Sequence, residues 1–172
     1  MVVKNKDCFE TYSPPDVTFS SFWNGLNNPA ITSPSLTNQE CWGVGSESTP
    51  PAPLSGQYME MDMGSFRTIV GVATQARGGF EVDPPAAFSD QWVETFEVMA
   101  KVDGIWTLVS APGGSTTFAG NFEGGDAVVR NDFAAPVSAQ KLRIYPLTYH
   151  TWRSMRAGVY LECNFFEQKG IP

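Results

Sequence analysis

The fold is decided by residues 58–77, which read YMEMDMGSFRTIVGVATQAR. In the first part, Met59, Met61 and Met63 alternate with polar residues. This period of two predicts a strand with one buried face over residues 57–63. Residues 68–74 then form a continuous run of small apolar side chains, which predicts a strand buried on both faces. Two strands in close succession, without helical periodicity, indicate an all-β chain.

The rest of the chain continues this pattern. Residues 92–102 alternate in the same way, and Asp103-Gly104 is a two-residue hairpin signal that predicts a return strand over 105–110. Further strands are expected at 127–131, 140–145 and 155–163. Short strands separated by turns predict an antiparallel sandwich or barrel. The side chains expected to face inward are Phe96, Val98, Ala100 and Val102 in one strand, and Met155, Ala157, Val159 and Leu161 in another.

Length and charge limit the function classes. A chain of 172 residues fits one domain, and its net charge of −7 argues against nucleic acid, which needs a basic surface. The same charge weakens attraction to anionic membranes. No apolar run approaches the roughly 18 residues that span a bilayer, so membrane insertion is not expected.

The first residues lack the apolar stretch of a signal peptide. This favours a protein that is cytoplasmic or secreted by a non-classical route, and an extracellular location is expected instead if a leader has been removed. Three cysteines, Cys8, Cys41 and Cys163, cannot all pair within one chain. Their spacing matches no zinc motif.

Several short motifs match one known family, in order along the chain. Residues 58–64 and 69–77 resemble its W-x-x-x-D-L-G and I-x-G-V-x-T-Q-G-R core, although Ala76 stands at the position of the last glycine. DGIW at 103–106 resembles its D-G-x-x-W turn, FAGN at 118–121 resembles F-x-G-N, and LRIYP at 142–146 resembles I-R-I-x-P. The chain therefore resembles discoidin domains, also called coagulation factor V/VIII C-type domains, over residues 8–163.

This resemblance implies the fold and the kind of function. It implies one domain over residues 1–172, with a core from about 8 to 163, folded as an eight-stranded antiparallel jelly-roll-like β-sandwich. Such domains are binding modules for glycans, phospholipid headgroups or proteins, and they bind through projecting loops. The family commonly joins its first and last cysteines, so the resemblance also implies a disulfide between Cys8 and Cys163 in an oxidising compartment.

Three inter-strand stretches, 20–28, 77–90 and 147–154, combine aromatic residues with turn chemistry, and loops at one end of a sandwich normally carry function. An exposed Trp can stack on a sugar or can plug the end of the sandwich; His150 can donate to a sugar hydroxyl or can be merely solvated. Arg77 can grip a ligand, or it can pair with a carboxylate such as Asp90. Trp42, Trp92 and Trp106 are expected in the core. The candidate ligand-binding residues are Trp23, Asn24, Arg77, Tyr149, His150, Trp152 and Arg153.

Metal and catalytic chemistry find little support in the residues. Glu81, Asp83 and Asp90 could supply oxygen ligands to Ca²⁺, but their spacing is not diagnostic and no cofactor is expected to be required. A Ser/His/Asp triad would have to use the single histidine, His150, and no Gly-x-Ser-x-Gly motif accompanies any serine. We therefore expect a protein that is not an enzyme.

Two classes of function remain. In the first, the domain is a lectin-like module that binds a glycan or glycoprotein, with a shallow weak site that would gain from a homo-oligomer. In the second, it is an intracellular scaffold subunit that docks onto a larger protein assembly, such as a cytoskeletal or ciliary one. Phospholipid binding is third, because the charge balance opposes it.

Overall fold

Two long strands organise the molecule. The computed structural model describes residues 9–12, 16–21, 36, 41–45, 56–77 and 90–162. The longest strands among them are β4 (Met59–Gln75) and β8 (Val129–His150), which pair antiparallel along most of their length. The others are β1 (Phe9–Tyr12), β2 (Asp16–Phe19), β3 (Trp42–Gly43), β5 (Trp92–Val102), β6 (Ile105–Leu108), β7 (Thr117–Ala119) and β9 (Ser154–Glu162). None of the described residues forms a helix of the length and apolarity needed to cross a bilayer.

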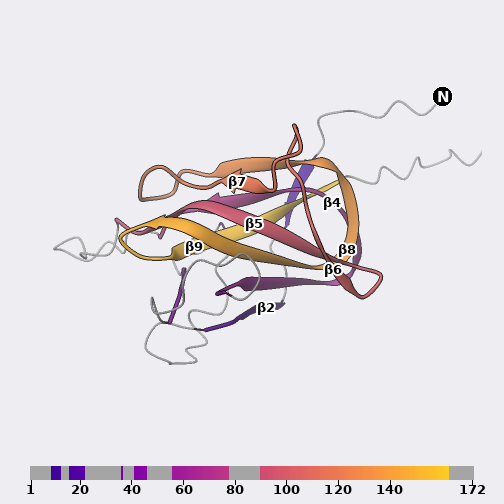
Figure 1. Ribbon diagram of the computed structural model, residues 1–172, viewed down its shortest axis with the longest axis horizontal. Coiled ribbons are helices and arrows are strands. Elements are labelled where there is room, and N and C mark those ends of the chain that lie inside the picture. Colours follow the sequence, from indigo (N-terminus) through magenta and orange to yellow (C-terminus); the bar gives the residue numbers. More distant parts are fainter. Residues whose placement is uncertain are drawn as a thin grey trace, which may run out of the picture.

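Each long strand contributes to both layers of the sandwich (Figure 1). Residues 59–62 of β4 pair with β2 and with residues 141–144 of β8, and this half of β8 pairs in turn with β5, whose other edge holds β6 and β7. Residues 67–75 of β4 pair with β9 and with the first half of β8, and β9 also holds β1. All of these pairings are antiparallel, so the predicted all-β antiparallel sandwich is confirmed.

The predicted strands 57–63 and 68–74 are one bent strand, which corrects the expectation of two. Gly64 has a φ of 72°, and its backbone N–H donates to the Asp62 carboxylate at 2.8 Å. The register with β8 shifts between Asp62 and Arg67, and pairing then resumes. The predicted strands 127–131 and 140–145 likewise belong to the single strand β8, which begins at Val129 and not at residue 127. The two parts are joined because β8 stays paired with β4 before and after the bend.

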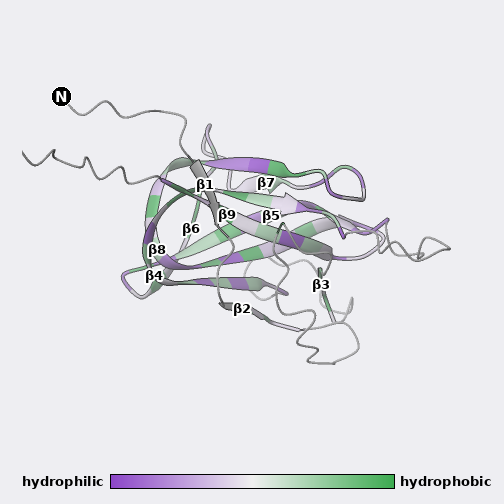
Figure 2. Cartoon of the chain, turned by 180° about the vertical axis from the view of Figure 1, so that it is seen from behind, coloured by the Kyte–Doolittle hydropathy of each residue, from purple (hydrophilic) through white to green (hydrophobic). Residues whose placement is uncertain are grey.

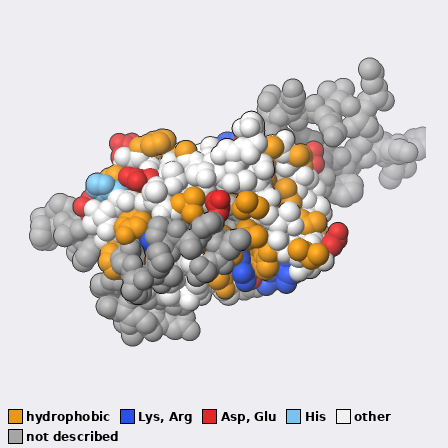
Figure 3. Space-filling view, in the orientation of Figure 1, with side chains coloured by type: hydrophobic (Ala, Val, Ile, Leu, Met, Phe, Trp, Pro, Cys, Tyr) orange, Lys and Arg blue, Asp and Glu red, His pale blue; other side chains and the backbone are white. Residues whose placement is uncertain are grey.

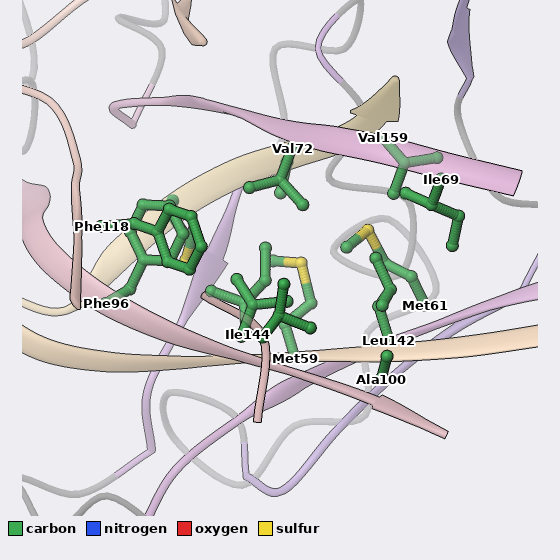
Figure 4. Close-up of a cluster of buried hydrophobic side chains, with 14 of the residues drawn as sticks. Met59, Met61, Ile69, Val72, Phe96, Ala100, Phe118, Leu142, Ile144 and Val159 are labelled. Carbon is green, nitrogen blue, oxygen red and sulfur yellow. The ribbon is translucent and has the colours of Figure 1, made fainter. Parts of the chain in front are cut away.

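The core lies between the two layers. Figure 4 shows Met59, Met61, Leu142 and Ile144 of one layer facing Ile69, Val72 and Val159 of the other. Hydrophobic and hydrophilic residues alternate along several strands in Figure 2, as the period of two predicts. The inward sets of β5 and β9 are confirmed: Phe96, Val98, Ala100, Met155, Ala157, Val159 and Leu161 are buried, and Val102 is half-buried against the core.

The hairpin prediction is also confirmed. Val102 pairs with Ile105, and Asp103 and Gly104 both have positive φ, as the two-residue turn requires. The tryptophan prediction is correct for one residue in three. Trp42 is buried and its indole N–H donates to the carbonyl of Ser21 at 2.9 Å. Trp92 and Trp106 are instead half-buried, and each ring stacks on a polar side chain.

Candidate functional site

The described parts of the predicted loops meet at one end of the sandwich. This end, at the left of Figure 1, is where β4 and β8 finish and where β5 and β9 begin. Backbone bonds hold it together: the N–H of Arg77 donates to the carbonyl of Gln91, and the N–H of Val44 donates to the carbonyl of Arg153, both at 3.1 Å. We call this region the loop end. Trp23 and Asn24 lie outside the described residues and stay predictions.

Arg77 braces the loop end. Its guanidinium Nη1 donates to the side-chain oxygen of Gln91 at 2.9 Å, and the hydroxyl of Ser154 donates to the same oxygen at 2.9 Å. Gln91 and Ser154 are both buried. One amide oxygen therefore ties the end of β4 to the start of β9. This geometry supports the structural alternative for Arg77, with an amide as the partner shown here.

Trp152 and Arg153 both form hydrogen bonds with Val44, the residue that follows β3. The indole N–H of Trp152 donates to the carbonyl of Val44 at 3.0 Å, and its side chain is half-buried. Arg153 is 3 % exposed, and its guanidinium lies 4.7 Å from the ring centroid of Tyr149. These contacts support the structural alternative for Trp152, in which its ring plugs the end of the sandwich.

His150 lies apart from this group. Successive side chains of a strand point to opposite faces, and Tyr149 and His150 are the last two residues of β8. His150 is exposed, and its ring lies flat on that of Trp92, with centroids 4.1 Å apart and planes 9° apart. We call this pair the His150–Trp92 stack. It presents one planar face, backed by an indole.

Sequence reasoning missed Trp92 as a site residue for an identifiable reason. Trp92 and Phe96 are an even number of residues apart in β5, so unbroken alternation would place both side chains on the inward face. The register with β8 shifts on both sides of Thr95. An irregularity of this kind exchanges the two faces. Consequently Val93 is buried and Trp92 turns outward.

A second missed feature is the loop over residues 120–128. Phe122 is 77 % exposed, and Val128 is exposed as well. The base of the loop is held firmly: the Asn121 N–H donates to Val93 at 2.9 Å, and the Asn121 side chain donates to Ala127 at 2.8 Å. Its signal in the sequence is an aromatic residue directly before the Glu-Gly-Gly-Asp turn.

A buried arginine, Arg156, forms hydrogen bonds with residues 125 and 126 of this loop. Arg156 is 2 % exposed, and its Nη2 donates to the Asp126 carboxylate at 2.7 Å and to the Gly125 carbonyl at 2.9 Å. The Gln75 amide also donates to the Asp126 carbonyl. The loop therefore presents Phe122 from a rigid base beside β5.

Two further predictions fall largely outside the described residues. Of the possible Ca²⁺ ligands only Asp90 is described; it is exposed and accepts a hydrogen bond from Thr151 at 3.3 Å. Within the described ranges no three His, Cys, Asp or Glu side chains gather as a metal site would need. Glu81 and Asp83 lie outside them, as do Cys8 and Cys163. Phe9 and Glu162, their neighbours in the chain, are paired with each other in the β1–β9 ladder. The disulfide between Cys8 and Cys163 stays a prediction.

Comparison with known proteins gives the family. The F5/8 type C domain profile matches residues 16–159. The chain belongs to the F5/8 type C domain family. The predicted discoidin-type membership is thereby confirmed.

Among curated relatives of this F5/8 type C domain, lactadherin of Mus musculus is 27 % identical over 101 residues, which are 58 % of this chain and 20 % of lactadherin. Lactadherin of Rattus norvegicus is also 27 % identical over 101 residues, 58 % of this chain and 22 % of that protein. The domain thus matches about a fifth of the length of these relatives.

Solved structures share the fold. Discoidin II from Dictyostelium discoideum matches 90 % of this chain and 59 % of its own, with a TM-score of 0.61 and 18 % identity. The family 32 CBM from C. perfringens NanJ, solved in complex with galactose, matches 84 % of this chain and 91 % of its own, with a TM-score of 0.56 and 16 % identity. At these identities the likeness concerns the architecture.

Proposed function

We propose that this F5/8 type C domain is a non-catalytic glycan-binding module that contacts its ligand at the loop end. The observation that carries this proposal is the His150–Trp92 stack, an exposed flat ring with a 4.1 Å stacking distance to the indole behind it. Apolar C–H faces of sugar rings stack on such surfaces, while polar groups around them fix orientation. Support also comes from the fold shared with a galactose-bound module.

The polar groups needed for orientation lie close to the stack. Thr151 and Asp90 are exposed and joined by a hydrogen bond; Thr151 directly follows His150, and Asp90 is two residues before Trp92. Thr95 and Thr148 form a 2.7 Å hydroxyl pair on the same two strands. Hydroxyls and a carboxylate around a flat ring suit sugar hydroxyls. A shallow site of this kind binds one ligand weakly, so we also propose that avidity in an oligomer raises its affinity.

A glycan array tests the proposal. With purified protein we expect signals on a subset of glycans, and His150→Ala is expected to lower them by at least about fivefold, because a stacking contact is lost. Phe66→Ala is the matched control, since Phe66 is also an exposed ring, 61 % accessible, but lies in the β4 bend away from the loop end. Absence of binding to every glycan at high protein density would contradict the proposal and favour docking onto a protein assembly.

A further inference from the structure

Exposed carboxylates lie on both sides of Trp92 in the chain. Asp90 is exposed beside Thr151, and Glu94 is exposed two residues after Trp92. Figure 3 shows the chain's single histidine with acidic side chains next to it, while blue side chains gather elsewhere in the same view. A ligand bound at His150 would therefore lie close to negatively charged carboxylates.

The loop 120–128 adds to this charge. Its first residue, Gly120, donates to the Glu94 carbonyl, which places the loop beside the stack's own strand. Glu123 and Asp126 are both exposed, and the Asp126 side chain is 80 % accessible although it also pairs with Arg156. The same exposed rim thus extends from the stack to Phe122.

The arginines of the loop end are directed into the fold. Arg153 lies against Tyr149 and Arg156 lies under the 120–128 loop, and both are buried. Arg77 is half-buried and donates to Gln91. Each of these three cations is engaged with the protein itself, and the exposed Arg130 that follows the 120–128 loop pairs with Asp132 at 2.8 Å.

The chain as a whole has the same sign, with 18 Asp and Glu against 11 Lys and Arg. Summed charge of one sign raises the local concentration of oppositely charged ligands and opposes like-charged ones.

We propose that the glycan recognised at the loop end contains positively charged amino sugars with a free amine, such as glucosamine units. This rests on the glycan-binding function proposed above and names its ligand class. The amine would lie against the carboxylates of Asp90 and Glu94 while a sugar face stacks on His150. Uronic acids, sulfated sugars and anionic lipid headgroups would meet repulsion at the same place.

Three oligosaccharides of equal length test this: a glucosamine oligomer, its N-acetylated neutral counterpart, and a galacturonic acid oligomer. Dissociation constants are measured by calorimetry at pH about 6, so that the amines of the glucosamine oligomer carry a positive charge, in low and in high salt. We expect the affinity to fall from the amino oligomer to the neutral oligomer and again to the acidic one. An exposed ion pair changes affinity by about 1.5- to 5-fold, so Asp90→Asn/Glu94→Gln should weaken amino-sugar binding by up to about 25-fold, and high salt should act in the same direction.

The outcomes separate this inference from the function on which it rests. Asp103→Asn is the control for the loss of a carboxylate outside the loop end, because it removes one from the β5–β6 hairpin turn at the opposite end and should leave all three affinities unchanged. Equal binding of amino and neutral oligomers, unaffected by the double substitution, would overturn the amino-sugar inference and leave glycan binding intact. Preference for the acidic oligomer, or for phosphatidylserine vesicles, would overturn it too. Binding to no oligomer here and to no glycan on the array would overturn both.

Discussion

Arg143 contacts two aromatic rings and a carboxylate on the outer sheet face. Its guanidinium lies 4.1 Å from the ring centroid of Tyr58 and 4.2 Å from that of Trp106, so it is held between two rings. Its Nε donates to the Glu60 carboxylate at 2.8 Å. One side chain thus joins β4, β6 and the residue before β4. This explains why Trp106 is not in the core: its ring covers Arg143.

At this residue we expect Arg143→Met to lower the free energy of unfolding by about 2 kcal/mol. Each cation–π contact contributes about 0.5–1 kcal/mol, and the half-buried Glu60 loses a charged partner. Arg130→Met is the comparison, because Arg130 contacts one ring, Tyr160 at 4.5 Å, and an exposed carboxylate, Asp132. Its cost should stay below about 1 kcal/mol. Urea denaturation measures both, and equal losses would contradict the importance of the double stack.

At the scale of elements, β4 depends on one close backbone approach. Gly71 lies between β8 and β9, where the register of both pairings shifts. A Cβ at this position would overlap the carbonyl oxygen of Asn131 and lie 3.2 Å from the Cα of Asp132. Both neighbours are backbone atoms of β8, so neither can rotate away. β8 can approach β4 this closely only because residue 71 has no side chain.

We therefore expect Gly71→Ala to destabilise the domain by about 3 kcal/mol, the upper part of the usual range for overpacking. Gly64→Ala provides the contrast. A Cβ at Gly64 meets no atom within 4 Å, and only its positive φ opposes a side chain, at about 1–2 kcal/mol. Thermal unfolding of the two variants should rank them in this order. A smaller loss at Gly71 than at Gly64 would show that β8 moves aside.

The whole molecule has two ends with different chemistry. Away from the loop end, Glu60, Asp62, Lys141 and Arg143 form an ion-pair network across β4 and β8, with Lys141 Nζ 3.0 Å from a carboxylate oxygen of both Glu60 and Asp62. Burial raises the pKa of Glu60, but hydrogen bonds from Arg143 and Lys141 outweigh it and bring the pKa below its ordinary 4.5. Burial also raises the pKa of Asp62, and bonds from the Gly64 N–H and Lys141 bring it below 3.8.

The sign of the pH dependence follows from these directions. Both carboxyls have a lower pKa in the folded state, so their stabilising contribution is present above pH about 4.5 and is lost as the pH falls through the lowered values. Stability should therefore decline from about pH 5 towards pH 2. The Glu60→Gln/Asp62→Asn variant should be less stable at pH 7 and show a shallower decline. Chemical denaturation across this range measures it; parallel profiles for both proteins would contradict the assignment.

Much of this architecture could be predicted before any coordinates. The alternating methionines of β4, the inward residues of β5 and β9 and the Asp103-Gly104 turn depend on local periodicity and turn chemistry, which the chain carries within a few residues. The position of the candidate site at the ends of β4, β5, β8 and β9 could be predicted for the same reason, because function normally sits in the loops between strands.

The sequence by itself determined an antiparallel sandwich of one known family, an acidic surface and the strands that bound the loop end. Only the tertiary structure decided which side chains meet there. The irregularity at Thr95 turns Trp92 outward beneath His150, and the alternation of β8 separates His150 from Tyr149. The carbonyl of Val44, just after β3, accepts the hydrogen bond of the Trp152 indole. These outcomes depend on register between strands distant in the sequence. A one-residue shift in register exchanges the faces of a strand without changing its local pattern.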